Sequence, residues 1–262
     1  MPELRLVQVD AFADRPFTGN PAAVVPLDAW LPDETLQAIA MENNLSETAF
    51  TVPDASGEAD YELRWFTPTT EVALCGHATL ASGHVLIDGA RVRFRTRKAG
   101  VLEVRSGISG YELDLPETLV APTAHSELLD ALGTPGGEVF LSVTGAEATA
   151  IILLENEAAV RACSPDMSKL KHIELMAIVT ARGDAHDVVS RVFVPAWGVD
   201  EDPVTGSAHA ALTPFWCERL GRDSFSAFQA SRRGGAVHCR RAGERTVLGG
   251  ECVTVLKGVL RF

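Results

Sequence analysis

The 262-residue sequence lacks the marks of several large classes of protein. Basic residues are scarce, with 23 Lys and Arg against 35 Asp and Glu, and the resulting formal charge of -12 would repel the phosphates of a nucleic acid. No run of about eighteen apolar residues occurs and no secretory leader opens the chain, so we expect a soluble protein without a membrane partner. The five cysteines include no C-x-x-C pair, which is typical of the reducing cytoplasm.

Motifs for cofactors and metals are also missing. The sequence has no G-x-G-x-x-G after a strand, no P-loop lysine and no G-x-S-x-G elbow, and it lacks H-E-x-x-H. His77 and His84 lie seven residues apart on a predicted helix, but no third ligand stands at a recognisable spacing. The sequence therefore predicts chemistry that uses neither a cofactor nor a metal.

Alternating and helical hydrophobic patterns follow one another along the chain and predict an α/β (α+β) fold. A segment with two prolines and no periodicity, 116–124, is the expected linker between domains 1–116 and 117–262, and the last strand could pack back on the first domain. The patterns predict helices at 31–44, 76–87, 126–132 and 208–219, with strands over most of the rest.

The two halves share the pattern R-x-F-x-P…G-[HS]-A. It begins at Arg64 and leads to Gly76 in the first half, and it begins at Arg191 and leads to Gly206 in the second. The offsets are 191 − 64 = 127 and 206 − 76 = 130 residues. We interpret the pattern as an internal duplication of a strand, a loop and a helix.

Each copy predicts a helix that begins at a glycine. Such a helix start exposes unpaired N–H groups and partial positive charge, and a ligand can approach glycine closely. His77 and Ser207 follow the two glycines and add side-chain donors. Two ordinary helix starts are the alternative, but a matched pair favours a site that binds a carboxylate at Gly76 and Gly206.

Four further residues could take part in chemistry. Asn20 stands in a Gly-Asn-Pro turn, where its side chain often bonds local backbone. Glu47 lies in a predicted strand and is either solvent-facing or placed in a cleft as an acid/base. Asp202 lies in the longer of the two loops before the glycine helices. Cys75 precedes the first helix and is either a reactive thiol or a buried structural cysteine.

The sequence resembles the phenazine-biosynthesis PhzF-like isomerases and epimerases, which are relatives of diaminopimelate epimerase. The segments that carry the resemblance span nearly the whole chain in order: Phe17–Ala22, Ser46–Phe50, Arg64–Ala81, Glu201–His209 and Gln229–Gly235. Residues 116–187 carry no motif of this family.

The resemblance implies two similar domains, each a curved, mostly antiparallel sheet or barrel around a central helix, with the active site in the cleft between them. It also implies a homodimer. It assigns acid/base catalysis to Glu47, supported by Asp202 and His77. Substrate binding falls to Asn20, Gly76, Gly206 and Ser207.

Three hypotheses remain open from the sequence. The first is a cofactor-independent isomerase in which Glu47 alone moves a proton on a small carboxylate-bearing metabolite. The second is a non-catalytic module that binds a small acid. The third is a thiol-dependent racemase or epimerase using Cys75. A two-thiol mechanism is not available, because the position that matches Cys75 in the second half is Thr205.

Overall fold

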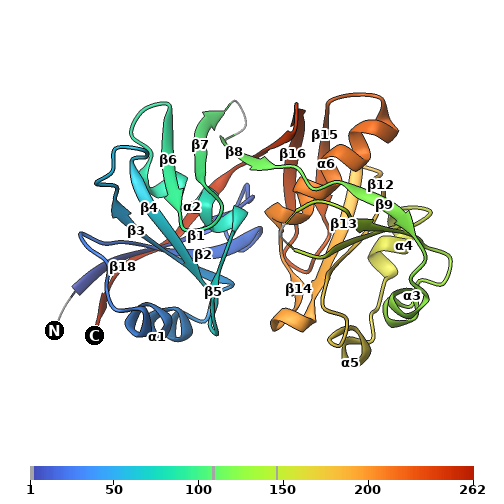
Figure 1. Cartoon of the computed structure of the whole chain (residues 1–262), viewed down its shortest axis with the longest axis horizontal. Helices are drawn as coiled ribbons and strands as arrows, with labels where there is room; N and C mark the ends of the chain where they lie inside the picture. Colours follow the sequence, from blue (N-terminus) through green and yellow to red (C-terminus); the bar gives the residue numbers. More distant parts are fainter. Residues whose placement is uncertain (1–2, 108–109, 146) are drawn as a thin grey trace. The chain divides into compact units, whose positions relative to one another are not determined.

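The computed structural model describes residues 3–107, 110–145 and 147–262, which form a mixed α+β fold (Figure 1). The chain divides into two compact units. The first comprises Met1–Asp114 together with Gly249–Phe262, and the second comprises Leu115–Leu248. Within the described ranges, no helix is long and apolar enough to span a membrane.

The first unit is a largely antiparallel sheet with two helices. Its parallel pairs are β2 with β3 and β4 with β6. Its elements are β1 (Glu3–Ala11), β2 (Asn20–Pro26), α1 (Asp33–Asn43), β3 (Glu47–Pro53), β4 (Tyr61–Phe66), β5 (Glu71–Val72), α2 (Gly76–Leu86), β6 (Arg91–Thr96), β7 (Val101–Gly107), β8 (Gly110–Pro116) and β18 (Cys252–Arg261).

Helix α2 is the central helix of this unit. All residues from Gly76 to Gly83 are buried, and the helix contacts β1, β2, β3, β6, β7 and β18. Small residues are required here because the sheet approaches closely. A Cβ atom at Gly83 would lie 2.4 Å from Val104 Cγ1 on β7. Helix α1 packs through Leu36, Ile39 and Ala40 on the outer side of the sheet.

The second unit repeats this plan with additional short helices. Its parallel pairs, β11 with β12 and β13 with β15, match those of the first unit. Its elements are β9 (Val120–Thr123), α3 (Ser126–Leu132), β10 (Glu138–Ser142), β11 (Thr149–Leu153), α4 (Glu157–Ala162), α5 (Met167–Leu170), β12 (Met176–Arg182), β13 (Val188–Val194), the 3-10 turn Pro195–Trp197, β14 (Val199–Asp202), α6 (Gly206–Leu220), β15 (Ser224–Gln229), β16 (Gly235–Ala242) and β17 (Arg245–Gly250).

The predicted duplication is confirmed in the order of elements. Strand β4, the short strand β5 and helix α2 correspond to β13, β14 and α6, and both helices begin at the predicted glycines. Helix α6 is also largely buried, from Gly206 to Cys217 apart from the half-buried Ser207.

Two segments contain a strand that the sequence patterns did not predict. The expected linker 116–124 begins next to the division between the units, and within it Val120–Thr123 pairs antiparallel with β10 as β9. Pro122 is tolerated in this short strand, where it stands opposite Phe140. Asp202 does not lie in an irregular loop but is the last residue of β14.

Candidate active site

Asn20 is the first residue of β2 rather than a turn residue, and it is fully buried. The turn ends at Gly19, which has a φ of +63°. A Cβ atom added to Gly19 would lie only 2.2 Å from Ala11 O, so no other residue fits at this position. The Asn20 Nδ2 atom lies 3.1 Å from His77 Nδ1, across 57 residues of sequence. The Asn20 side chain therefore makes a contact between distant elements.

Glu47 is the first residue of β3, which runs parallel to β2 beside it. Its side chain is only 16% exposed, so the solvent-facing alternative is wrong. Glu47 Oε2 lies 2.8 Å from His77 Nε2, which is an ion-pair distance. This oxygen is buried and makes no well-aligned hydrogen bond to any described residue, so the exposed part of the side chain lies elsewhere.

Cys75 and His77 lie at the start of α2, where Cys75 is the residue before the first helical turn. Cys75 Sγ lies 3.5 Å from His77 Nδ1 and 4.0 Å from His77 Nε2. Burial raises the pKa of the Cys75 thiol to about 11, and the charge of Glu47 contributes in the same direction. The thiol is therefore protonated at neutral pH.

His77 is buried, and burial alone lowers its pKa. The neighbouring Cys75 and Glu47 outweigh this effect, so the pKa of His77 lies well above its ordinary value. A charged imidazole needs an acceptor near each nitrogen. Glu47 lies at Nε2, and at Nδ1 the acceptor is Cys75 Sγ or the Asn20 amide turned to present its oxygen.

His84 does not join this group. Its Nδ1 lies 3.0 Å from Tyr111 Oη, and its Nε2 lies 2.8 Å from Thr254 Oγ1. The structure thus brings Asn20, Glu47, Cys75 and His77 together in the first unit, at the start of α2.

Asp202, Gly206 and Ser207 belong to the second unit, at the start of α6. The Thr205 hydroxyl donates to Asp202 Oδ2. Gln229, which is fully buried, donates to Asp202 O at 2.7 Å and accepts from the Thr205 backbone N–H at 2.9 Å. Ser207 is half-buried, and its Oγ lies 3.9 Å from Met176 Sδ.

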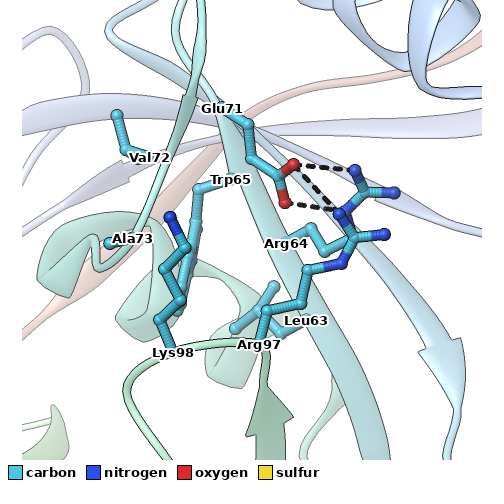
Figure 2. Close-up of a pocket in the computed structure, with 8 residues that line it drawn as sticks. All are labelled: Leu63, Arg64, Trp65, Glu71, Val72, Ala73, Arg97 and Lys98. Carbon is cyan, nitrogen blue, oxygen red and sulfur yellow. Dashed lines mark hydrogen bonds and ion pairs between the residues drawn. The ribbon is translucent and has the colours of Figure 1, made fainter.

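A pair of arginine–glutamate bridges was missed by the sequence reasoning. Arg64 binds Glu71 through two bonds of 2.8 Å each, as Figure 2 shows. Arg191 binds Glu201 in the same way, at 2.7 and 3.0 Å. Each bridge ties the strand of a repeat to the short strand that leads into its glycine helix. The signal was available, since both glutamates stand five residues before their glycines.

The adjacent acids Glu201 and Asp202 have different partners. Glu201 forms an ion pair with Arg191, whereas Asp202 accepts a hydrogen bond from the Thr205 hydroxyl at the start of α6. In the first unit the Arg64–Glu71 bridge borders a pocket of about 190 Å³, lined further by Trp65, Arg97 and Lys98 (Figure 2). Asn20, Glu47 and His77 do not line this pocket.

His209, one turn into α6, is fully buried. Its Nδ1 donates to Thr205 O at 2.8 Å, and its Nε2 has no partner among the described residues. Burial lowers the pKa of His209 to about 4, so the unfolded chain binds this proton more readily than the folded chain between about pH 4 and 6.5.

We therefore expect His209 to lower the free energy of unfolding as the pH falls. The full stability is present above the unfolded pKa of about 6.5, and between pH 7 and pH 5 the protein should lose about 2 kcal/mol of it. Chemical denaturation at both pH values measures it. His209→Gln should show a smaller loss of unfolding free energy than the natural chain, and an equal loss in both would contradict the assignment.

Known proteins are similar to this chain in sequence and in fold. The family model PhzC-PhzF, phenazine biosynthesis-like protein, matches residues 9–258. An uncharacterized isomerase of Pseudomonas aeruginosa is 50% identical over 267 residues, covering 99% of each chain. A PhzF-family phenazine biosynthesis protein of Enterococcus faecalis superimposes with a TM-score of 0.91 at 42% identity, covering 100% of each chain.

A more distant solved structure shares the fold alone. The hydroxyproline epimerase of Agrobacterium vitis superimposes with a TM-score of 0.62 at 14% identity, covering 98% of this chain and 92% of that one. The fold is therefore that of the PhzF and epimerase proteins, and the comparisons identify this chain as an isomerase. It belongs to the PhzC-PhzF family of phenazine biosynthesis-like proteins.

Proposed function

We propose that the protein moves a proton on a small carboxylate-bearing metabolite without a cofactor, with Glu47 as the single acid/base. The observation that carries this proposal is the contact of 2.8 Å between Glu47 Oε2 and His77 Nε2. It holds one carboxylate oxygen against a buried imidazole and leaves part of the Glu47 side chain accessible. We assign proton removal and return to Oε1, because Oε2 is occupied by His77.

Glu47 suits this role better than Cys75. A thiol with a pKa of about 11 is protonated at neutral pH and is therefore a poor base, whereas part of the Glu47 side chain is accessible to a substrate. The position equivalent to Cys75 in the second unit is Thr205, whose hydroxyl is bound to Asp202. These facts favour one-base transfer on one face of the substrate over a thiol-dependent racemase.

The other residues bind and orient the substrate in this proposal. The amides at Gly76 and Gly206 receive carboxylate oxygens, because the first N–H groups of a helix have no partner within it. Asn20 orients His77, and Asp202 and Ser207 bind polar groups of the substrate. The proposal places the substrate in the cleft between the domains and treats the working form as a homodimer.

The test is solvent-deuterium incorporation into small amino and hydroxy acids and their unsaturated analogues. We expect deuterium at one carbon of a substrate that carries a carboxylate, with uptake that depends on the protein. Nuclear magnetic resonance and mass spectrometry locate the label. Binding of such acids without any exchange would instead support a non-catalytic module and overturn the proposal.

A further inference from the structure

We propose that the pocket of about 190 Å³ in the first unit binds a small oxyanion through the Lys98 ammonium group and the Trp65 indole N–H. The residues that line this pocket do not include the acid/base cluster of Glu47 and His77. The binding of an oxyanion stands on the geometry and charge of the pocket and does not depend on the proposed function.

The pocket forms where two strands meet along one edge of β4. Strand β3 occupies the opposite edge over the whole length of β4. On the pocket edge, β6 pairs with residues 61–63 and β5 pairs with residues 65–66. Because β5 occupies the end of this edge, β6 stops at Thr96 and the chain bends away through Lys98. The pocket is therefore a gap in the sheet between β5 and the end of β6.

Trp65 lines the pocket and carries a hydrogen-bond donor without an acceptor. The residue is 2% exposed, and its Nε1 atom is buried with no partner among the residues that the structure describes. A buried N–H group that lacks an acceptor costs about 1–3 kcal/mol, so such groups in folded proteins are normally paired with protein, water or a ligand. An oxyanion in the pocket supplies the missing acceptor.

Lys98 supplies a positive charge that no other side chain uses. It is exposed on the bend after β6 and makes no hydrogen bond or ion pair within the described part of the chain. An anion can therefore bind the ammonium group without breaking an existing ion pair. The flexible four-carbon stem of lysine also lets the side chain move while the anion enters.

The charges around the pocket favour an anion. Its lining residues include three cations and one acid, a local charge of 3 − 1 = +2 in a chain of formal charge -12: Arg64, Arg97, Lys98 and Glu71. The charge of Glu71 is balanced, because Arg64 binds both of its oxygens and Arg97 binds one of them. Figure 2 shows the Glu71 carboxylate turned toward these arginines, with the Lys98 ammonium group apart from it on the side of Ala73.

The size and position of the pocket fit a single acidic group. Its volume lies below the range of about 300–1,000 Å³ that is typical of pockets for drug-sized ligands. Trp65 pairs with Ala49 on β3, and Glu47 lies two residues before Ala49 on the same face of the sheet. Diagonal neighbours on one face are about 7–8 Å apart. The same oxyanion chemistry thus serves a free anion and a second acidic group on a substrate of Glu47, and the experiment distinguishes these two sources.

The experiment titrates inorganic phosphate into the full natural chain labelled with nitrogen-15 in its tryptophans, at constant ionic strength in chloride. Nuclear magnetic resonance follows the four indole N–H signals, and the Trp65 signal is the one missing from Trp65→Phe. We expect the Trp65 signal to move downfield and to saturate as its N–H gains a charged acceptor. A Trp65 signal that phosphate does not move overturns the proposal.

Variants test the role of Lys98. Lys98→Gln should weaken phosphate binding about tenfold, and Lys98→Arg should keep most of the affinity. Lys257→Gln is the matched control, because Lys257 is also exposed in the first unit but does not line the pocket. Calorimetry with phosphate gives the same comparison if Trp65→Phe does not fold. Equal affinity of Lys98→Gln and the natural chain, or an equal loss in Lys257→Gln, contradicts the assignment.

A second measurement identifies the source of the oxyanion, and this measurement alone rests on the proposed function. Solvent-deuterium exchange is measured with and without phosphate. Where the pocket takes an acidic group of the substrate, phosphate should compete and raise KM, and Lys98→Gln should raise KM with little change in kcat. An unchanged KM in both identifies a free anion as the ligand. A Trp65 signal that responds to phosphate without any exchange keeps the site and rejects the proposed function, whereas exchange without that response does the reverse.

Discussion

Glu47→Gln is expected to lower solvent-deuterium exchange and turnover by about a thousandfold, within the range that a positioned acid/base group contributes. The amide has nearly the same shape as the carboxyl group, and its oxygen can still face His77 Nε2. It cannot take a proton from carbon. We therefore expect the variant to fold normally and to bind a substrate carboxylate about as well as the natural chain.

Glu42→Gln is the matched control for this experiment, because Glu42 is exposed on α1 only five residues earlier. It should exchange deuterium at the natural rate. Circular dichroism and thermal unfolding establish that both variants are folded. Exchange by Glu47→Gln within about threefold of the natural rate would reject Glu47 as the acid/base.

Arg64→Met is expected to destabilise the first unit by about 3 kcal/mol, at the lower end of the cost of breaking a buried ion pair. The Arg64 side chain is 3% exposed, binds Glu71 and Asp33, and stacks on Trp30 and Phe66. Methionine fills similar volume but leaves the Glu71 carboxylate without its main partner. Because Glu71 is 29% exposed, water can solvate its unpaired carboxylate, and this reduces the loss of stability.

Arg64→Lys separates charge from geometry. A lysine keeps the positive charge but cannot make two parallel hydrogen bonds to Glu71. We therefore expect Arg64→Lys to have a free energy of unfolding between that of the natural chain and that of Arg64→Met. Arg191→Met is the matched variant in the second unit, where Arg191 binds Glu201 and stacks on Phe193. Chemical denaturation measures all three, and equal stability of Arg64→Met and the natural chain would contradict the role of the bridge.

The fold was predictable where local patterns are strong. The helix starts at Gly76 and Gly206, the strands that precede them and the duplication of these elements all follow from short-range residue preferences. The strand within 116–124 was not predicted, for the opposite reason. Strand β9 has little pattern of its own, and it exists because β10 offers backbone partners to Val120–Thr123.

The candidate site was predictable in its residue types but not in its contacts. The family motifs single out Asn20, Glu47 and His77, yet a bare glutamate in a strand is as consistent with solvent as with a cleft. Gln229 was overlooked as a support of the Asp202–Thr205 segment, because nothing in its own neighbourhood shows that its side chain reaches back 24 residues to Thr205.

By itself, the sequence determined the class of fold, the repeat and the side chains available for proton transfer, because these depend on local periodicity and on residue chemistry. Only the tertiary structure decided that Glu47 is half-buried against His77 and that Cys75 and Asn20 contact the same imidazole ring. It also decided that Arg64 and Arg191 bind the short strands that precede the two glycine helices. The physical reason is that these contacts, apart from that of Cys75 with His77 at the start of α2, join different elements, so burial, charge and pKa depend on how the strands are paired.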